Sequence, residues 1–158
     1  MTMNQITKSF ANILNESDEF SDFCTEVIDN NFIYYLNIDP VTLNEIPLPY
    51  FSITTYNEKD EPGSHKGFQI QFLVGIMKED VPDTTAGTII VDNTLEKLEN
   101  VVSKAIEIIT NEIRVFGIDG DKSANIAFIN KYVPKADGEE DLQMQIDIGL
   151  EQDKFLSC

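Results

Sequence analysis

Two segments far apart in the chain alternate apolar and polar residues with a period of two, and this pattern constrains the fold most. In the first, Gly67 to Lys78, every second residue from Phe68 to Ile76 is apolar. In the second, the apolar residues from Leu142 to Leu150 alternate with polar residues or glycine. Successive side chains of a strand point to opposite faces, so each segment predicts a strand with one buried face. The chain therefore needs a second layer to cover that face.

Amphipathic stretches supply the second layer. Apolar residues recur at helical spacing in residues 2–15, from Phe20 to Ile28, and in the longest stretch from Asn93 to Gly117. Further strands are predicted at Phe32–Ile38, Tyr50–Tyr56, Ile126–Val133 and, as a short edge strand, Thr88–Val91. The order predicts one α+β domain over residues 1–158, with a mostly antiparallel sheet and with one long helix and an N-terminal helical segment packed on one face.

The connection from Asn57 to Gly67 is polar and contains Pro62 and Gly63, which predicts an extended hairpin tip between two strands. Its side chains are candidates for contacts with a neighbouring subunit: Asn57, Glu58, Lys59, Asp60, Glu61, Ser64, His65 and Lys66. The acidic clusters are expected in loops, where water screens like charges: Glu58/Asp60/Glu61, Glu79/Asp80 and Glu139/Glu140/Asp141.

The charge balance argues against reading a nucleic-acid sequence. Eleven lysines and arginines face 28 aspartates and glutamates, which gives a net charge of −17, and Arg114 is the only arginine. Such a surface repels phosphate and has little capacity for bidentate contacts. Neither a secretory signal nor a membrane span is recognisable, so we expect the protein to be made and folded in a cytoplasm. Cys24 and Cys158 are expected to be two free thiols.

No catalytic or metal-binding motif emerges. His65 is the only histidine, and its neighbour Ser64 is too constrained by adjacency to form a nucleophile and base pair with it. One histidine and two distant cysteines do not make a zinc site. The run Asp119–Ser123 imitates a calcium loop but has Ala124 and Asn130 where glycine and glutamate are needed. We therefore expect no enzymatic activity, no cofactor and no metal.

The layout resembles the tail terminator, or tail completion, proteins of long-tailed bacteriophages. The resemblance lies in the N-terminal helix, the proline-marked strand Pro47–Ile53, the polar loop, the alternating strand Phe68–Ile76, the long helix from Asn93 and the last strand Gln143–Glu151. It implies a virion protein that forms a ring, hexameric in that family, on the tail tube. Such a ring stops tube growth and offers the surface for head attachment. The implied partners are further copies of the chain, the tail-tube protein and a head-completion or neck protein.

Strand alternation adds a hypothesis about the ring channel. Gln143, Gln145, Asp147 and Glu151 would face the lumen and let DNA pass without specific binding, because they offer no cationic phosphate sites.

Other interpretations remain open. A monomer would simply present the glutamines of two strands to water: Gln69, Gln71, Gln143 and Gln145. Another neck, head–tail connector or baseplate protein of a phage would have the same features. A protein of a different class, an acidic DNA mimic that inhibits a nucleic-acid-binding protein, would exploit the negative charge. It would need carboxylates in rows, whereas the regular strands carry glutamine.

Overall fold

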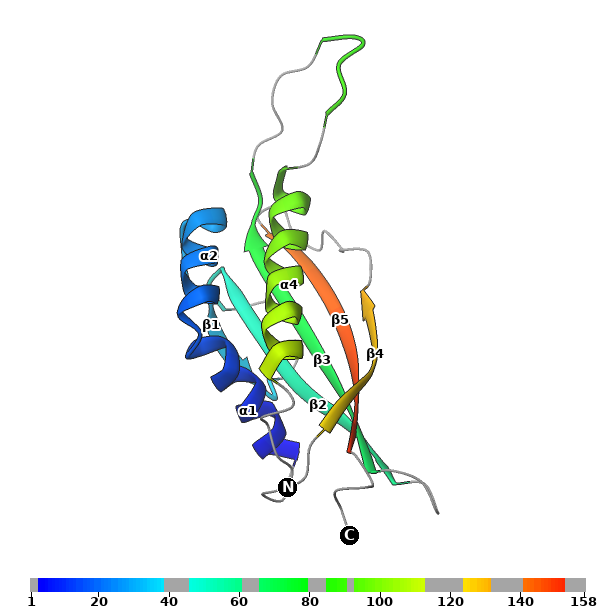
Figure 1. Cartoon of the computed structure of the whole chain (residues 1–158). Coiled ribbons are helices and arrows are strands. Elements are labelled where there is room, and N and C mark those ends of the chain that lie inside the picture. The colour runs from blue at the N-terminus through cyan, green and yellow to red at the C-terminus, as the bar shows by residue number, and fades with distance from the viewer. Residues whose placement is uncertain are drawn as a thin grey trace.

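The protein is an α+β fold in which three described helices lie on one side of a sheet (Figure 1). The computed structural model describes residues 3–38, 46–60, 66–79, 85–90, 93–112, 124–131 and 141–152. The elements in chain order are α1 (Met3–Asn15), α2 (Asp18–Ile28), β1 (Ile33–Leu36), β2 (Tyr50–Asp60), β3 (Lys66–Met77), α4 (Asn93–Glu112), β4 (Ala124–Lys131) and β5 (Asp141–Gln152). The predicted fold class is confirmed.

The described strands form one sheet in the order β1-β2-β3-β5-β4. Three of the pairings are antiparallel, and the fourth, β1 with β2, is parallel, starting with Ile33 opposite Tyr50. The two strongly alternating segments, β3 and β5, are neighbours at the centre of the sheet, where Phe72 lies opposite Ile146. A central position explains the strength of their pattern, because both backbone edges are paired and one full face is buried.

Each helix buries the stripe that its spacing predicts. In α4 the buried positions include Leu98, Val102, Ala105 and Ile109, which recur every three or four residues. Helix α2 starts where Ser17 accepts a hydrogen bond from the backbone N–H of Phe20 (3.1 Å) and ends at Asp29 in the left-handed conformation. The break between α1 and α2 lets both short helices lie against the sheet beside α4, as Figure 1 shows.

An aromatic cluster holds the helices to the sheet. The ring of Phe51 on β2 lies 5.3 Å from that of Phe72 on β3 and 5.5 Å from that of Phe32, between centroids. Phe20 of α2 and Phe10 of α1 complete the contact from the helical side. All five side chains are buried, and full burial of such a side chain contributes about 1.5–3 kcal/mol.

Two boundaries differ from the sequence prediction. Strand β2 continues to Asp60 and strand β3 begins at Lys66, so the hairpin connection is shorter than the predicted Asn57–Gly67. The polar side chains there are weak strand formers, but pairing with β3 overrides their propensity. The edge strand predicted at Thr88–Val91 is wrong for its described part, because residues 88–90 are exposed and unpaired. A β-branched run forms a strand only beside a partner strand.

Several acidic residues also lie outside the loops that were expected for them. Glu58 and Asp60 belong to β2 and Asp141 starts β5, whereas Glu79 lies just after β3. Glu61, Asp80, Glu139 and Glu140 fall outside the described residues, as do the calcium-like run Asp119–Ser123 and Cys158.

Candidate interaction surfaces

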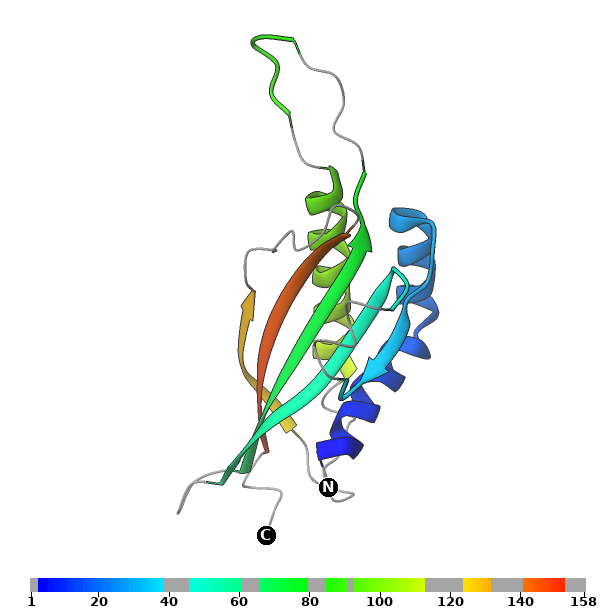
Figure 2. The same cartoon turned by 180° about the vertical axis from the view of Figure 1, so that it is seen from behind.

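No described helix covers the face of the sheet opposite α1, α2 and α4, and we call it the open face (Figure 2). Strand alternation assigns residues to it, because Ile70, Phe72, Val74 and Ile76 belong to the core on the other side. The residues in register on the open face are Ile33, Tyr35, Tyr50, Ser52, Thr54, Gln69, Gln71, Leu73, Gly75, Gln143, Gln145 and Asp147.

A tyrosine bridge crosses the open face at one end. Tyr50, Gly75 and Gln143 are neighbours in register on β2, β3 and β5. The ring of Tyr50 lies directly over Gly75, where an added Cβ would be 2.6 Å from two of its carbons. The hydroxyl of Tyr50 accepts a hydrogen bond from Nε2 of Gln143. Glycine is therefore required at position 75 for the tyrosine to reach the third strand, a relation that the alternation pattern alone did not reveal.

The candidate lumen residues share the open face but differ in burial. Gln143 is only 8% exposed because the tyrosine bridge covers it, so the expectation of a water-facing side chain does not hold there. Gln145 and Asp147 are half-buried, as are Gln69 and Gln71. The side chain of Glu151 lies outside the described set, although its backbone pairs with Gly67.

Asp147 carries an unfulfilled acceptor. Its Oδ1 atom is buried and has no hydrogen-bond partner within the described part of the chain. Asp147 lies between Gln71 of β3 and Asn130 of β4 in register. A buried acceptor without a donor costs roughly 1–3 kcal/mol, so a donor supplied from outside would be stabilising.

The candidate contact residues of the hairpin are brought to one end of the sheet. Asn57 to Asp60 form the end of β2, and Asp60 pairs with Lys66 at the start of β3. Glu61, Ser64 and His65 fall outside the described residues. Because Gly67 pairs with Glu151, the structure joins the hairpin end to the end of β5, which sequence reasoning had treated as a separate set.

The outer edge of β2 changes partner at Asn37. Strand β1 stops at Leu36, and Asn37 adopts the left-handed conformation (φ 53°). The side chain of Asn37 then accepts a hydrogen bond from the backbone N–H of Thr55 (3.4 Å) and donates one to Asn4 (3.1 Å). The hydroxyls of Thr7 and Thr55 are 2.9 Å apart and buried. These hydrogen bonds connect α1 to β2, and they satisfy the edge of β2 beyond the end of β1 as far as Thr55.

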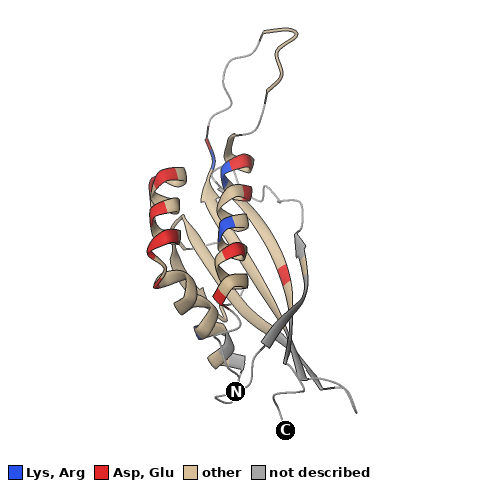
Figure 3. Ribbon diagram, in the orientation of Figure 1, with Lys and Arg blue, Asp and Glu red and all other residues tan. Residues whose placement is uncertain are grey.

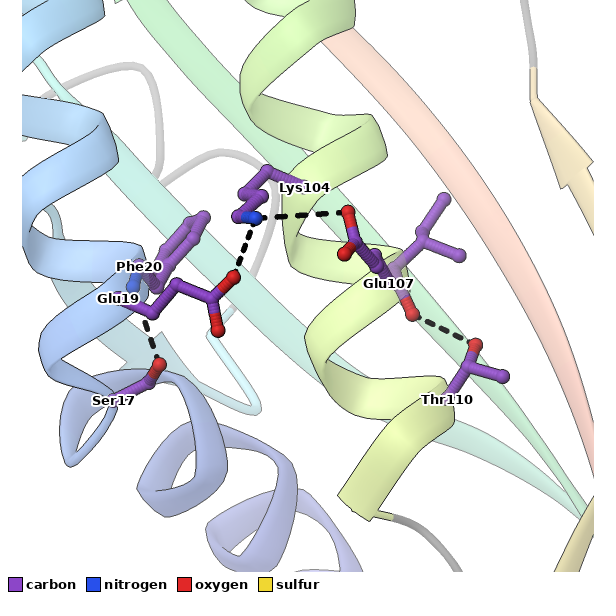
Figure 4. Close-up of polar contacts among 7 residues, drawn as sticks. Ser17, Glu19, Phe20, Lys104, Glu107 and Thr110 are labelled. Atoms are coloured by element: carbon purple, nitrogen blue, oxygen red, sulfur yellow. Dashed lines mark hydrogen bonds and ion pairs between the residues drawn. The ribbon is translucent and has the colours of Figure 1, made fainter.

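The helical side carries most of the described negative charge (Figure 3). We call this surface the acidic helical layer; its exposed carboxylates lie on α2 and α4, namely Asp18, Glu19, Asp22, Glu26, Glu96, Glu99, Glu107 and Glu112. Lys104 bridges the two helices through Glu19 (2.6 Å) and also contacts Glu107 (3.7 Å), as Figure 4 shows. The hydrogen bond with Glu19 is the main reason that the pKa of Lys104 is raised.

Residues 85–90 lie at the far end of the molecule, beyond α4, and we call them the tip (Figure 1). All six are exposed, and Ile89 and Ile90 are the apolar residues among them with the largest side chains. Sequence reasoning assigned part of this segment to an edge strand and missed it as a surface. The signal that could have identified it is the turn sequence Thr-Ala-Gly-Thr just before two isoleucines.

Two further findings bear on chemistry. Burial raises the pKa of the Cys24 thiol to about 12, so this free cysteine has the character of a packing residue and not of a nucleophile. Among the described residues, no group of histidine, cysteine and carboxylate side chains has a metal-binding arrangement. None of the described helices has the length and apolar character needed to cross a membrane.

Comparison with known proteins adds no family to this picture: no protein-family model matches the chain, and no curated protein matches it in sequence.

Proposed function

We propose that this protein is a structural component of a phage virion, a tail terminator that forms a ring on the end of the tail tube. The observation that supports this most is the two-sided sheet, with helices on one face and a polar open face on the other. In a ring of identical subunits, such a sheet can turn one face to the channel while the helical layer faces outward. The proposal also draws on the resemblance in element order.

The open face suits a channel through which DNA moves. On the two central strands, Leu73 is an apolar side chain of this face, and its described polar side chains are four amides and one carboxylate: Gln69, Gln71, Gln143, Gln145 and Asp147. Phosphate binding by proteins depends on lysine and arginine, and neither occupies a described position on this face. DNA that passes this face would therefore meet no described positively charged side chain that could bind its phosphates. The end of the hairpin, with Asp60 and Lys66, would contact the tube or the next subunit.

The first experiment tests assembly and its consequence for the tube. The chain is purified, its mass in solution is measured, and it is mixed with the tail-tube protein encoded in the same genome while polymerisation is followed by electron microscopy. A terminator is expected to give rings at tube ends and to limit tube length. Tubes of unchanged length with no added density at their ends would refute the proposal. Density on head portals instead would identify a neck protein.

The channel assignment has its own matched pair of variants. Asp147→Lys places a positive charge on the open face, and Glu26→Lys makes the same charge change on the exposed surface of α2. If the open face lines the channel, particles with Asp147→Lys should eject DNA more slowly than the wild type, whereas Glu26→Lys should not. Equal ejection kinetics in both variants would remove the open face from the channel.

The acidic helical layer favours a second candidate function, the DNA mimic. Regular helices now carry carboxylates in rows, which the sequence had not indicated, with Asp18 and Asp22 one turn apart on α2 and Glu96 and Glu99 on α4. A mimic would bind a restriction or repair enzyme in a salt-sensitive way. Charge reversal at Asp22 and Glu99 should abolish that binding, and a lack of binding by the wild type removes this candidate.

A further inference from the structure

The two outer strands of the sheet, β1 and β4, each have one edge that no described strand pairs with. We call these the outer edges. Figure 1 shows them on opposite flanks of the sheet, with β1 on the side of α1 and α2 and β4 beyond β5. An outer edge presents a row of backbone N–H and C=O groups, and a further strand satisfies such a row directly.

The backbone groups that β1 offers follow from one hydrogen bond. The N–H of Asn37, directly after the strand, donates to the carbonyl oxygen of Ile53 in β2 (2.9 Å). Successive residues of a strand turn their N–H and C=O groups to opposite edges, so Tyr35 also faces β2. The N–H and C=O groups of Tyr34 and Leu36 therefore point to the outer edge, where they form a site for a strand.

Neither edge strand contains a carboxylate, although the chain has 28 of them. Strand β1 is Ile-Tyr-Tyr-Leu, without charge or proline, and β4 contains one lysine, Lys131. Soluble proteins usually protect exposed edges with charges, prolines or bulges. In β4 a bulge lies between Ile126 and Phe128, which leaves Phe128–Lys131 as a regular segment of the same length as β1. Two copies of net charge −17 meet less repulsion at these strands than along the acidic helical layer.

Strand direction selects a second copy of this chain as the partner. Strand β1 runs parallel to β2, and the three other pairings are antiparallel, so β1 and β4 run in opposite directions. When a second copy lies beside the first in the same orientation, β4 of one meets β1 of the next as an antiparallel pair. Antiparallel pairs are the more stable kind. One chain thus supplies both halves of the contact, whereas a foreign strand would satisfy only one edge.

We propose that β4 of one copy pairs antiparallel with β1 of the next, so that the sheet continues from subunit to subunit. The backbone groups of Tyr34 and Leu36 would bond to the segment Phe128–Lys131 of the neighbour. The two edges differ, so the contact is heterologous and closes a ring or extends a filament. It leaves the open face and the helical layer on the two sides of the ring wall. This inference rests on the self-assembly part of the proposed function and adds which strands make the contact.

Amide hydrogen exchange resolved to single residues tests the contact. The chain is compared as a dilute monomer and as an assembly, formed by concentration or on tube ends, with each state defined by sedimentation or electron microscopy. The N–H groups of Tyr34 and Leu36 should exchange at least about tenfold more slowly in the assembly. The N–H of the exposed Ile89 is the control and should exchange equally fast in both states. Assembly that leaves Tyr34 and Leu36 unprotected, or no assembly under either condition, would overturn the inference.

Association strength gives an independent readout. Ile33 starts β1 and is 56% exposed, so the fold tolerates a change there. Ile33→Glu places a carboxylate on the acid-free edge and should raise the dissociation constant for self-association at least about tenfold. Thr25→Glu adds the same charge at an exposed position of α2, and Ile33→Gln adds none; each should change the constant by less than about threefold. Equal effects of the two glutamates in analytical ultracentrifugation, or a large effect of Ile33→Gln, would contradict pairing through the backbone.

The two proposals fail in distinguishable ways. Rings at tube ends in which the N–H groups of Tyr34 and Leu36 still exchange rapidly would refute the strand contact and leave the terminator role standing. Protection of both groups in an assembly that has no effect on the tube would support the strand contact and refute the terminator role.

Discussion

The two faces of this sheet use the same strands and differ in chemistry. On the helix-covered face, Phe51 and Phe72 meet other aromatic rings and the core is apolar. Among the described side chains of the open face, Tyr50 is the one fully buried aromatic residue; it lies outside that core cluster and ends in a hydrogen bond to Gln143. The covered face gains its stability from the apolar area that it buries, which does not depend on any single contact. The open face depends on a few specific contacts, such as the hydrogen bond between Tyr50 and Gln143.

Truncating the aromatic cluster should have the largest effect. Phe51→Ala removes a ring that lies within 6.5 Å of the rings of Phe20, Phe32, Tyr34 and Phe72, and we expect the free energy of unfolding to fall by about 3–5 kcal/mol. Urea denaturation followed by circular dichroism measures it. Thr54→Ala on the opposite face of the same strand is the control, with an expected loss below about 1 kcal/mol. Similar losses would mean that the faces do not differ as described.

Adding one methyl group to the open face should have the next largest effect. Gly75→Ala places a Cβ 2.6 Å from the ring of Tyr50, and the shift that this forces should cost about 1–3 kcal/mol of unfolding free energy. A double-mutant cycle with Tyr50→Leu tests the cause, because the cost of the methyl group should fall by more than half when the ring is absent. An unchanged cost would show that the strain arises elsewhere.

Removing one hydroxyl should have a smaller effect. Tyr50→Phe keeps the ring over Gly75 but takes away the acceptor for Nε2 of Gln143, and we expect a loss of about 1–2 kcal/mol. Tyr35→Phe changes a half-buried tyrosine on the same face of the neighbouring strand β1, and it should reduce the free energy of unfolding by less. If the two variants have the same denaturation midpoint, the hydrogen bond of the tyrosine bridge contributes nothing to stability.

The smallest effect at neutral pH concerns Cys24 beneath the helices. Burial raises the pKa of this thiol from 9.0 to about 12, so the folded state holds the proton more tightly than the unfolded state. The stabilisation that comes from this tighter proton binding is complete below pH 9, and it is lost as the pH rises toward 12. Between pH 8 and pH 10, the wild type should lose about 1 kcal/mol more unfolding free energy than Cys24→Ala.

A labelling experiment checks the same feature. In the Cys158→Ser background, Cys24 should react with a thiol reagent at pH 8 only after denaturation, because its side chain is 1% exposed. Rapid labelling of the native protein would show that the helical layer admits solvent.

The sequence predicted the elements that rely on their own periodicity. Helix α4 and strands β3 and β5 each bury one regular stripe, so their type and approximate bounds follow from residue spacing. The parallel pairing of β1 with β2 did not follow, because pairing depends on contacts between segments and not on the pattern of either one. The same limit explains the errors at Asn57–Asp60, where a partner strand extends a polar segment, and at residues 88–90, where a β-branched run has none.

The surfaces were predicted less well than the core. Alternation placed Gln145 and Asp147 on the open face but could not show that Tyr50 would reach over β3 to bury Gln143. Such a bridge needs a small residue on one strand and a long side chain on another, separated by 25 positions in the sequence. The sequence shows each helical carboxylate separately. That the carboxylates of α2 and α4 form one layer is apparent only from the structure, in which the two helices lie side by side.

The overlap of the Tyr50 ring with position 75 has an evolutionary consequence. Neither residue can change first without a penalty, because a side chain at position 75 collides with the ring and loss of the ring uncovers Gln143. Descendants of this sequence should therefore keep the tyrosine and the glycine together or exchange both, so that the two alignment columns covary.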